Sequence, residues 1–361
     1  MAYKVKKMRR SVCGFGGTIA VFLALCAFAI LSAAAYAQHG KKDLQVYFVD
    51  VEGGQATLFV APGKHSLLID TGWPDNNGRD ADRIVAAAKL AGIRKIDYVL
   101  LTHYHDDHSG GVPQLVERIP VGGFIDHGAN IETKPGNRTL AVWQAYQNVL
   151  ATGKYQHIVA HPGDVLPVQG MKVTVISSDG NTISQPLPGA GQANQSCSID
   201  DHKPMDTSEN SHSLGVLIEF GKLRILDLGD LTWDKEKQFM CPANLIGKID
   251  VLVVSHHGFR PSSSHALIDG IAPRVAVMDN AETKGGNIPV LDTIRQTPSL
   301  ETLWQLHYSK EGGPEHNTQA EYIANPQGSE AGSYILLSAS PKGGFTVFNS
   351  GNQKSQEYPA K

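Results

Sequence analysis

Short runs of apolar, β-branched and aromatic residues recur along this chain, and turn residues such as Gly, Pro, Asn and Asp separate them. Such runs predict β-strands, while apolar residues spaced three and four apart predict helices. The predicted strands are residues 44–51, 56–61, 66–70, 96–101, 123–126, 171–177, 214–220, 223–228, 251–255, 274–278, 302–307, 334–338 and 344–348. The predicted helices are residues 80–91, 112–118 and 140–152, and residues 181–211 are predicted to form a long loop that borders the active site. Strands, a polar turn and a helix follow one another twice, which indicates two related β-rich halves that face each other with helices outside.

Residues that can carry chemistry stand where several of these strands end. Asp70, Asp230 and the pair His256 and His257 each come at the end of an apolar run. Because a sheet presents functional groups at the ends of its strands, these residues are expected to share one site. Asp70 is either a turn residue or a carboxylate that orients a metal-bound histidine.

The densest group of potential ligands follows the predicted strand 96–101. His103 and His105 are two residues apart on a strand end, so their imidazoles can point toward one place. If a helix begins directly after them, Asp107 and His108 lie at its N-terminus beside the same place. Four nitrogen and oxygen ligands within six residues predict a site for zinc or a similar divalent ion.

Three further residues are candidates for direct roles near this site. His256 and His257 are adjacent, and adjacent residues on an extended strand point to opposite sides, so at most one is expected to bind metal. The other histidine can donate a proton to the leaving group or bind substrate. Arg260 follows the HHG turn and is the candidate phosphate-binding group, with a surface arginine as the alternative.

The first 37 residues are typical of a secretory signal peptide. Five basic residues precede an apolar run over residues 18–31, and Ala35-Tyr36-Ala37 follows it. We therefore expect a signal peptide over residues 1–37, a single domain over residues 38–361, and a periplasmic or secreted protein. An uncleaved membrane anchor is the alternative, and no other membrane contact is expected.

The charge and cysteine content of residues 38–361 narrow the expected partners. This part holds 27 basic and 35 acidic residues, a net charge of −8. A net negative surface disfavours a stable complex with long nucleic acid, so the expected substrate is a small molecule or a short phosphodiester. Cys197 and Cys241 can pair in an oxidising compartment, with metal binding as the alternative. The oligomeric state is left open.

Four motifs together resemble the metallo-β-lactamase superfamily. They are the HxHxDH of residues 103–108, the LIDTG of residues 68–72, Gly229-Asp230, and the SHHG that begins at Ser255. Residues 44–264 more specifically resemble the hydrolase domain of ComEC/Rec2-type competence proteins. The resemblance implies an α+β fold, a four-layer αβ/βα sandwich with two divalent metal ions at one edge, zinc or alternatively manganese, and a metal-bound hydroxide as the nucleophile. It implies His103 and His105 at the first ion, Asp107, His108 and His256 at the second, and Asp230 between them.

The chain departs from this superfamily at several places. Relatives commonly supply a third histidine for the first metal where this chain reads ENSHS, residues 209–213, so His212, Asn210 or a water is expected there. Competence-type relatives have a serine where this chain has Phe259, and a GQGD-like turn where this chain reads EGGQ, residues 52–55. These differences count against a competence-type nuclease.

The leading hypothesis is an exported dinuclear metal-dependent hydrolase of a phosphodiester or related ester, in which Asp107 and His257 are catalytic. A β-lactam or lactone hydrolase is the first alternative. A non-catalytic extracellular binding protein with a structural metal is the second, and the number of candidate ligands, larger than one closed structural site needs, disfavours it.

Overall fold

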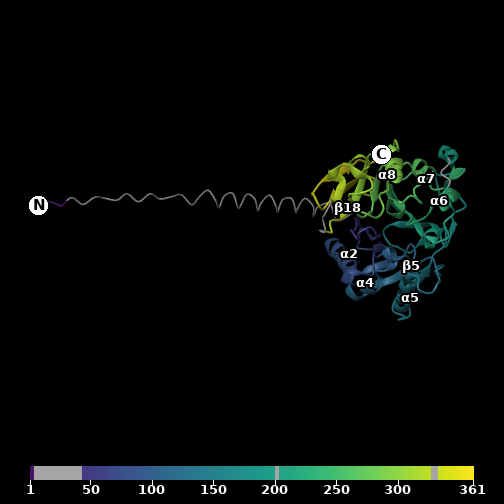
Figure 1. The fold of residues 1–361 in the computed structure, drawn as a ribbon, viewed down its shortest axis with the longest axis horizontal. Coiled ribbons are helices and arrows are strands. Elements are labelled where there is room, and N and C mark those ends of the chain that lie inside the picture. Colours follow the sequence, from purple (N-terminus) through teal and green to yellow (C-terminus); the bar gives the residue numbers. More distant parts are fainter. Residues whose placement is uncertain (4–42, 200–202, 327–331) are drawn as a thin grey trace. The chain divides into compact units, whose positions relative to one another are not determined.

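The computed structural model describes residues 1–3, 43–199, 203–326 and 332–361 (Figure 1). Apart from residues 1–3, the predicted signal peptide lies outside the described residues. The chain from Lys42 to Lys361 forms one compact unit. Among the helices that the structure describes, none has the length and apolar character needed to cross a membrane.

The first sheet of this unit has the strand order β20-β19-β18-β1-β2-β3-β4-β5-β6 within the described residues. Its N-terminal strands β1, β2 and β3 pair antiparallel, and β3, β4, β5 and β6 pair parallel. The strands are β1 Leu44–Phe48, β2 Thr57–Val60, β3 Ser66–Ile69, β4 Ile96–Leu100, β5 Val121–Asp126, β6 Gln156–Val159, β18 Ile335–Ala339, β19 Phe345–Asn349 and β20 Ser355–Tyr358.

The second sheet has the order β17-β16-β15-β14-β12-β11-β8-β7, with β9 paired to β8. Its strands are β7 Val165–Leu166, β8 Lys172–Ser178, β9 Asn181–Thr182, β11 Gly215–Phe220, β12 Leu223–Asp227, β14 Val251–Val253, β15 Val275–Met278, β16 Thr302–His307 and β17 Ile323–Asn325. The strands from β12 to β17 run parallel, so β12 and β14 end at the same edge. A separate short pair joins β10 Gln192–Ala193 to β13 Ala243–Asn244.

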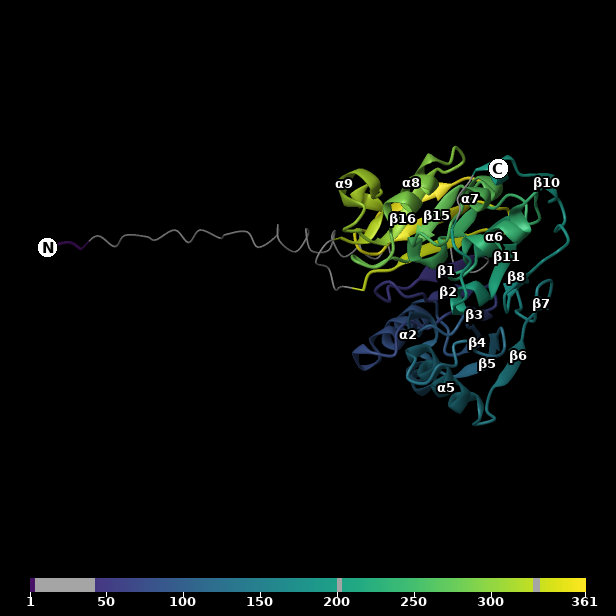
Figure 2. The same ribbon diagram turned by 45° about the vertical axis from the view of Figure 1, so that its right-hand side comes forward.

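Helices cover the two sheets on their outer faces (Figures 1 and 2). Helices α2, α4 and α5 lie on one side of the strands, and α6, α7 and α8 lie on the other side. The helices are α2 Arg79–Leu90, α3 Asp106–Ser109, α4 Val112–Arg118, α5 Arg138–Leu150, α6 Trp233–Met240, α7 His265–Ile271, α8 Ile288–Gln296 and α9 Gly313–His316. Shorter 3-10 turns are η1 Asn76–Gly78, η2 Gln195–Ser198, η3 Glu209–His212, η4 Ser255–Gly258 and η5 Ala320–Tyr322.

Three apolar clusters fill the spaces between these layers. One lies between the sheets and includes Leu100 and Ile225. The second joins the first sheet to α2, α4 and α5, and the third joins the second sheet to α6, α7 and α8. Successive residues of a strand point to opposite faces, so Val46 enters the central cluster while Tyr47 enters the second. The arrangement confirms the expected four-layer αβ/βα sandwich.

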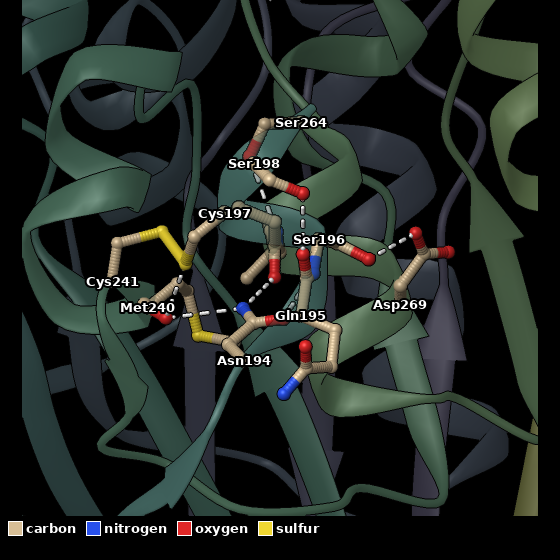
Figure 3. Close-up of a disulfide and its surroundings, with 11 residues drawn as sticks. Asn194, Gln195, Ser196, Cys197, Ser198, Met240, Cys241, Ser264 and Asp269 are labelled. Atoms are coloured by element: carbon tan, nitrogen blue, oxygen red, sulfur yellow. Dashed lines mark hydrogen bonds between the residues drawn. A yellow bond between two sulfur atoms is a disulfide. The ribbon is translucent and has the colours of Figure 1, made fainter. Parts of the chain in front are cut away.

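The predicted long loop over residues 181–211 contains short elements and a disulfide. Cys197 and Cys241 are bonded, with their Cα atoms 5.7 Å apart (Figure 3). Beside this bond, the amide of Asn194 donates to the carbonyl oxygen of Met240 at 3.0 Å. The structure therefore pairs the two cysteines and ties this loop to the end of α6.

Candidate metal centre

The ends of the three strands β4, β12 and β14 bring the candidate ligands to one place. Strand β4 leads into His103 and His105, and His105 is the residue directly before α3, which carries Asp107 and His108 in its first turn. Strand β12 leads into the Gly229-Asp230 turn, where Gly229 has φ +55° and an added Cβ would lie 2.7 Å from Thr102 Cβ. Only a glycine allows the turn that carries Asp230 to approach the strand of the histidines so closely.

Asp107, His108, Asp230 and His257 form a buried group of potential ligands. One ligand atom of each lies within 4.8 Å of the others. The Nε2 atoms of His108 and His257 are 3.1 Å apart, and His257 Nε2 lies 3.2 Å from Asp107 Oδ2. His108 Nε2 lies 3.2 Å from Asp230 Oδ1. Two nitrogens and two carboxylates therefore face one small volume.

His103 and His105 form a second group beside the first. The Nε2 atom of His103 lies 3.1 Å from Nδ1 of His105 and 3.9 Å from Oδ2 of Asp230. Asp230 thus directs Oδ1 toward His108 and His257, and Oδ2 toward His103. This position between the groups is the one expected of a bridging carboxylate.

Hydrogen-bond partners behind the rings fix which nitrogens face the centre. His108 Nδ1 lies 2.7 Å from Asp70 Oδ2, and His105 Nε2 lies 3.0 Å from Glu132 Oε1. His257 Nδ1 lies 3.3 Å from Asp279 Oδ1. Asp70 and Glu132 accept the proton of the nearer nitrogen, so the other nitrogen of His108 and of His105 presents a lone pair to the centre. His257 Nδ1, in contrast, lies near Asp279 with no hydrogen-bond partner among the described residues.

His103 obtains the same orientation through a hydroxyl group. The Oγ1 atom of Thr102 donates its proton to Asp70 Oδ2 at 2.7 Å. The lone pairs of Thr102 Oγ1 are then free to accept a hydrogen bond from His103 Nδ1 at 3.0 Å. The Nε2 atom of His103 therefore also carries a lone pair toward the centre. Asp70 supports both His103, through Thr102, and His108 directly.

Lone pairs that converge in a buried volume require a cation among them. Asp230 Oδ1 is buried and has no hydrogen-bond partner among the described residues, although His108 and His257 face it. A buried acceptor without a partner is rare and calls for an explanation such as a bound ion. Imidazole nitrogens and carboxylate oxygens suit zinc and manganese, so the donor set fits two divalent metal ions.

The electrostatics of the centre keep Asp107, Asp230 and His103 in metal-binding forms. Burial lowers the pKa of His108, but the charges of Asp230 and Asp107 hold it well above its usual value. Burial raises the pKa of Asp107, but the charges of Lys284 and His108 hold it well below its usual value. Burial also raises the pKa of Asp230, while the neighbouring His108 and His256 bring it well below its usual value. Burial, followed by repulsion from His108, lowers the pKa of His103 well below its usual range, so this ring stays neutral.

Comparison with known proteins agrees with this geometry. Residues 49–172 match the profile of the metallo-beta-lactamase superfamily. These residues are therefore similar to a metallo-β-lactamase hydrolase domain. The chain is 28% identical to Recombination protein 2 of Haemophilus influenzae over 279 residues, 77% of this chain and 28% of that protein. It is 23% identical to ComE operon protein 3 of Bacillus subtilis over 247 residues, 65% of this chain and 28% of that protein.

A shorter match relates this chain to an atrochrysone carboxyl ACP thioesterase of Aspergillus fumigatus. The two are 42% identical over 121 residues, which are 32% of this chain and 27% of the thioesterase. The chain thus spans about a quarter to a third of the length of each of these relatives. The matches support a hydrolase with the domain type of the competence proteins.

The structure assigns the adjacent histidines differently from the sequence-based expectation. His257, not His256, joins Asp107, His108 and Asp230, while His256 Nε2 lies 3.4 Å from Asp230 Oδ2. The expectation assumed an extended strand, but both histidines lie in the turn η4 with φ of 56° and 53°. His257 therefore lies among the potential ligands, and His256 lies at the side of this group.

Two other predicted site residues lie apart from the ligand groups. His212 Nδ1 lies 2.9 Å from Asp179 Oδ1, and its ring packs beside Gly180. Arg260 is about half exposed and pairs with Glu311 at 2.5 Å. The neighbouring chain segments hold both side chains in ion pairs, so neither contributes to the group of four ligands described above.

Sequence reasoning missed Glu132, Asp279 and Lys284. Asp279 follows the predicted strand 274–278, so the strand-end pattern that identified Asp70 could have found it. Glu132 and Lys284 lie in irregular segments without such a signal. Lys284 Nζ donates to Asp107 Oδ2 at 2.6 Å and to the carbonyl oxygen of Gly53.

A second cluster of potential ligands has its own counter-charge. Asp50, Glu52 and His307 also lie within reach of a single ion. Arg83 Nη1, however, lies 3.0 Å from Asp50 Oδ2 and 3.4 Å from Glu52 Oε1. His307 Nε2 lies 2.7 Å from Asp50 Oδ1. The cluster is thus an ion-pair network that joins the end of β16 to the segment after β1.

Proposed function

We propose that this protein is an exported hydrolase that cleaves a phosphodiester or related anionic ester with two divalent metal ions. Zinc is the first candidate for both ions, and manganese is the alternative. The observation that carries the substrate class is the position of Lys284 at the ligand group. Export is inferred from residues 1–37, which have the order of a signal peptide.

Lys284 places a positive charge directly beside the reacting centre. Its Nζ atom is 2.6 Å from Asp107 Oδ2, and that oxygen is itself 3.2 Å from His257 Nε2. A cation at this place suits a substrate whose negative charge lies on the reacting atom, as in a phosphodiester. The carboxylate of a β-lactam is separated from its scissile carbonyl by several bonds, so it would need a cation farther from the ligands.

Two aromatic rings flank the same ammonium group. Lys284 Nζ lies 5.3 Å from the ring centroid of Trp73 and 5.6 Å from that of Phe259. Both rings and the lysine side chain are partly exposed. This arrangement gives an anionic ester an aromatic surface for its leaving group or its neighbouring base.

The residues of the chain divide the remaining tasks. When bound, two divalent ions lower the pKa of water and so supply a nucleophile at neutral pH. Asp107 holds Lys284 at the entrance, and Lys284 binds a non-bridging oxygen of the substrate. Burial lowers the pKa of His256 to about 4, so at neutral pH this ring is uncharged and serves to hydrogen-bond the substrate rather than to protonate it.

The charge of the molecule argues for a short substrate. Residues 38–361 carry a net charge of −8, which repels a long polyanion. The similarity to Recombination protein 2 covers only 28% of that relative, so the function of the longer protein is not carried over. A nucleotide, dinucleotide or other small phosphodiester fits these two observations.

The proposal is tested by turnover of purified residues 38–361 loaded with zinc or manganese. The substrates are bis-p-nitrophenyl phosphate, a chromogenic cephalosporin and a simple lactone. We expect cleavage of the phosphodiester, and loss of that cleavage in Asp107→Ala. Cleavage of only the cephalosporin or lactone would replace the phosphodiester proposal, and no cleavage by a protein that holds two ions would favour a binding function.

Lys284→Met distinguishes the substrate-binding role, and Arg260→Met is its matched control. We expect Lys284→Met to raise KM for the phosphodiester by about 10- to 100-fold, the usual effect of losing a hydrogen bond to a charged group. Arg260 pairs with Glu311 and should change KM little. An effect of Arg260→Met with none of Lys284→Met would reverse the two roles.

Export is tested separately in cells that express the full chain. We expect the protein in the periplasm or the medium, with an N-terminus near Gln38. A full-length protein in the membrane fraction would support the uncleaved anchor, and a full-length protein in the cytoplasm would contradict export.

A further inference from the structure

The group around His103 and His105 contains fewer carboxylate oxygens than its neighbour. Two imidazole nitrogens and one oxygen of Asp230 face it, and Nε2 of His256 lies 3.4 Å from that same oxygen. The neighbouring group has two imidazoles, Asp107 and the other oxygen of Asp230. A further donor for the first group is expected from the turn η3, residues 209–212, which contains both Asn210 and His212.

The structure turns the histidine of this segment away. Both ring nitrogens of His212 have neighbours in another segment. Nδ1 lies 2.9 Å from Asp179 Oδ1, and Nε2 lies beside Gly180. A Cβ added at Gly180 would be 3.3 Å from Nε2 of His212. The residue at 180 therefore has to be small for the ring to occupy this position.

Asn210 instead lies beside His256 at the edge of the metal centre. Its Nδ2 atom is 3.5 Å from Nε2 of His256, which in turn is 3.4 Å from Asp230 Oδ2. The Oδ1 atom of Asn210 is buried and has no hydrogen-bond partner in the part of the chain that the structure describes. This buried amide oxygen is a hydrogen-bond acceptor without a partner, next to a group of metal ligands. Its lone pairs are therefore free to bind a metal ion.

We propose that Asn210 Oδ1 is the protein ligand that completes the first metal site in place of a third histidine. The inference rests on the proposed dinuclear centre and adds the identity of a ligand. Asn210 and His256 then lie side by side at the edge where the first ion binds.

Glu209 holds this turn in a fixed relation to the histidines. Its carboxylate accepts from the backbone N of Tyr104 at 3.2 Å, and Tyr104 is the residue between His103 and His105. The same carboxylate accepts from the backbone N of Ile131 at 2.7 Å, next to Glu132, which orients His105. Asn210 directly follows Glu209, so one buried carboxylate positions the segments that carry His103, His105 and Asn210.

The ligand change predicts a difference between the two sites. An amide oxygen is neutral and harder than an imidazole nitrogen, so it binds zinc less strongly and is better suited to manganese. The first site should therefore release its ion at a lower chelator concentration than the second. It should also discriminate less between zinc and manganese than a site with three histidines.

Metal binding without substrate tests this inference independently of the proposed reaction. Purified residues 38–361 are dialysed against buffered series of free Zn²⁺ and of free Mn²⁺, and bound metal is measured by mass spectrometry. Asn210→Ala should weaken the weaker of the two Zn²⁺ ions by about 10- to 100-fold and leave the tighter ion unchanged. His212→Ala is the matched control and should change neither ion.

Two additional variants keep the test decisive if Asn210→Ala folds poorly. Asn210→Asp retains an oxygen donor and should tighten the weaker ion, while Asn210→His should raise its preference for Zn²⁺ over Mn²⁺. Loss of an ion in His212→Ala, or unchanged binding in all three Asn210 variants, would overturn the assignment. A wild-type protein that binds two ions but cleaves no phosphodiester would contradict the proposed function alone.

Discussion

The metal centre has a first half around His103 and His105 and a second half around His108 and His257. The two halves differ in which segments of the chain supply their ligands. Around His108 and His257 the donors come from the ends of regular elements, α3 and the turn after β14, and a carboxylate lies behind each ring. Around His103 and His105 two donors come from the end of β4, but the third is inferred to come from a turn that follows a long irregular segment. A half built on strand ends is defined by local sequence, whereas the other half depends on where a loop is placed.

The largest expected effect separates His257, a candidate ligand of the second half, from the adjacent His256. His257→Ala removes a nitrogen 3.1 Å from His108 Nε2, so we expect the loss of one metal ion and a fall in turnover of at least about 10³-fold. His256→Ala should retain both ions and lose about tenfold in kcat/KM, since it removes only a hydrogen bond to substrate. Bound metal and turnover are measured on both variants. The opposite pattern would return the ligand role to His256.

The contrast between the two halves also describes what the sequence could predict. HxHxDH follows an apolar run, and its spacing predicts that His103, His105, Asp107 and His108 lie together. Asp230 was expected beside them from its position at a strand end and from the superfamily resemblance. The sequence could not show which of His256 and His257 joins the ligand group. Their orientation depends on a positive φ at both residues, in a turn that follows the strand. Alternation along a strand does not apply to such a turn.

The fold shows the same limit at its short elements. Strands with both faces buried, such as β14 and β15, are continuous apolar runs and were predicted. Helices α6, α7 and α8 contain only 8, 7 and 9 residues, which is too few turns for a helical period alone to indicate them. The equally short α4 was predicted because it continues the helix expected to begin at Asp107. Strand β6 is largely exposed at the sheet edge and has too few apolar residues for the pattern.

The second prediction concerns the disulfide. Cys197 lies in the irregular segment that precedes the turn η3, from which the further ligand of the first half is inferred to come. Cys197 and Cys241 are 44 residues apart, so replacing both with serine should lower the free energy of unfolding by about 3–4 kcal/mol. Denaturant unfolding with and without a reductant measures this difference. The ion of the second half should remain bound, because its ligands come from α3 and from the ends of β12 and β14. Loss of the tighter ion in the folded double variant would show that the halves are not independently supported.

The smallest expected effects come from the carboxylates behind single histidines. Glu132→Gln removes a charge 3.0 Å from His105 in the first half, and Asp279→Asn removes one 3.3 Å from His257 in the second half. Each variant should weaken only the ion of its own half, by about 10- to 100-fold. Zn²⁺ titration in competition with a chromogenic chelator measures both affinities in each variant.

Glu132→Gln should have the larger effect of this pair. The Glu132 carboxylate is itself fixed, since it accepts from Asn137 Nδ2 at 2.8 Å and from the backbone N of Glu209 at 3.1 Å, whereas neither oxygen of Asp279 has a hydrogen-bond partner among the described residues. Asp70→Asn is the control that should weaken both ions, because Asp70 contacts His108 directly and orients His103 through Thr102. If Glu132→Gln and Asp279→Asn also weakened both ions equally, the two halves would respond as one unit. The difference in how the chain supplies them would then have no consequence for binding.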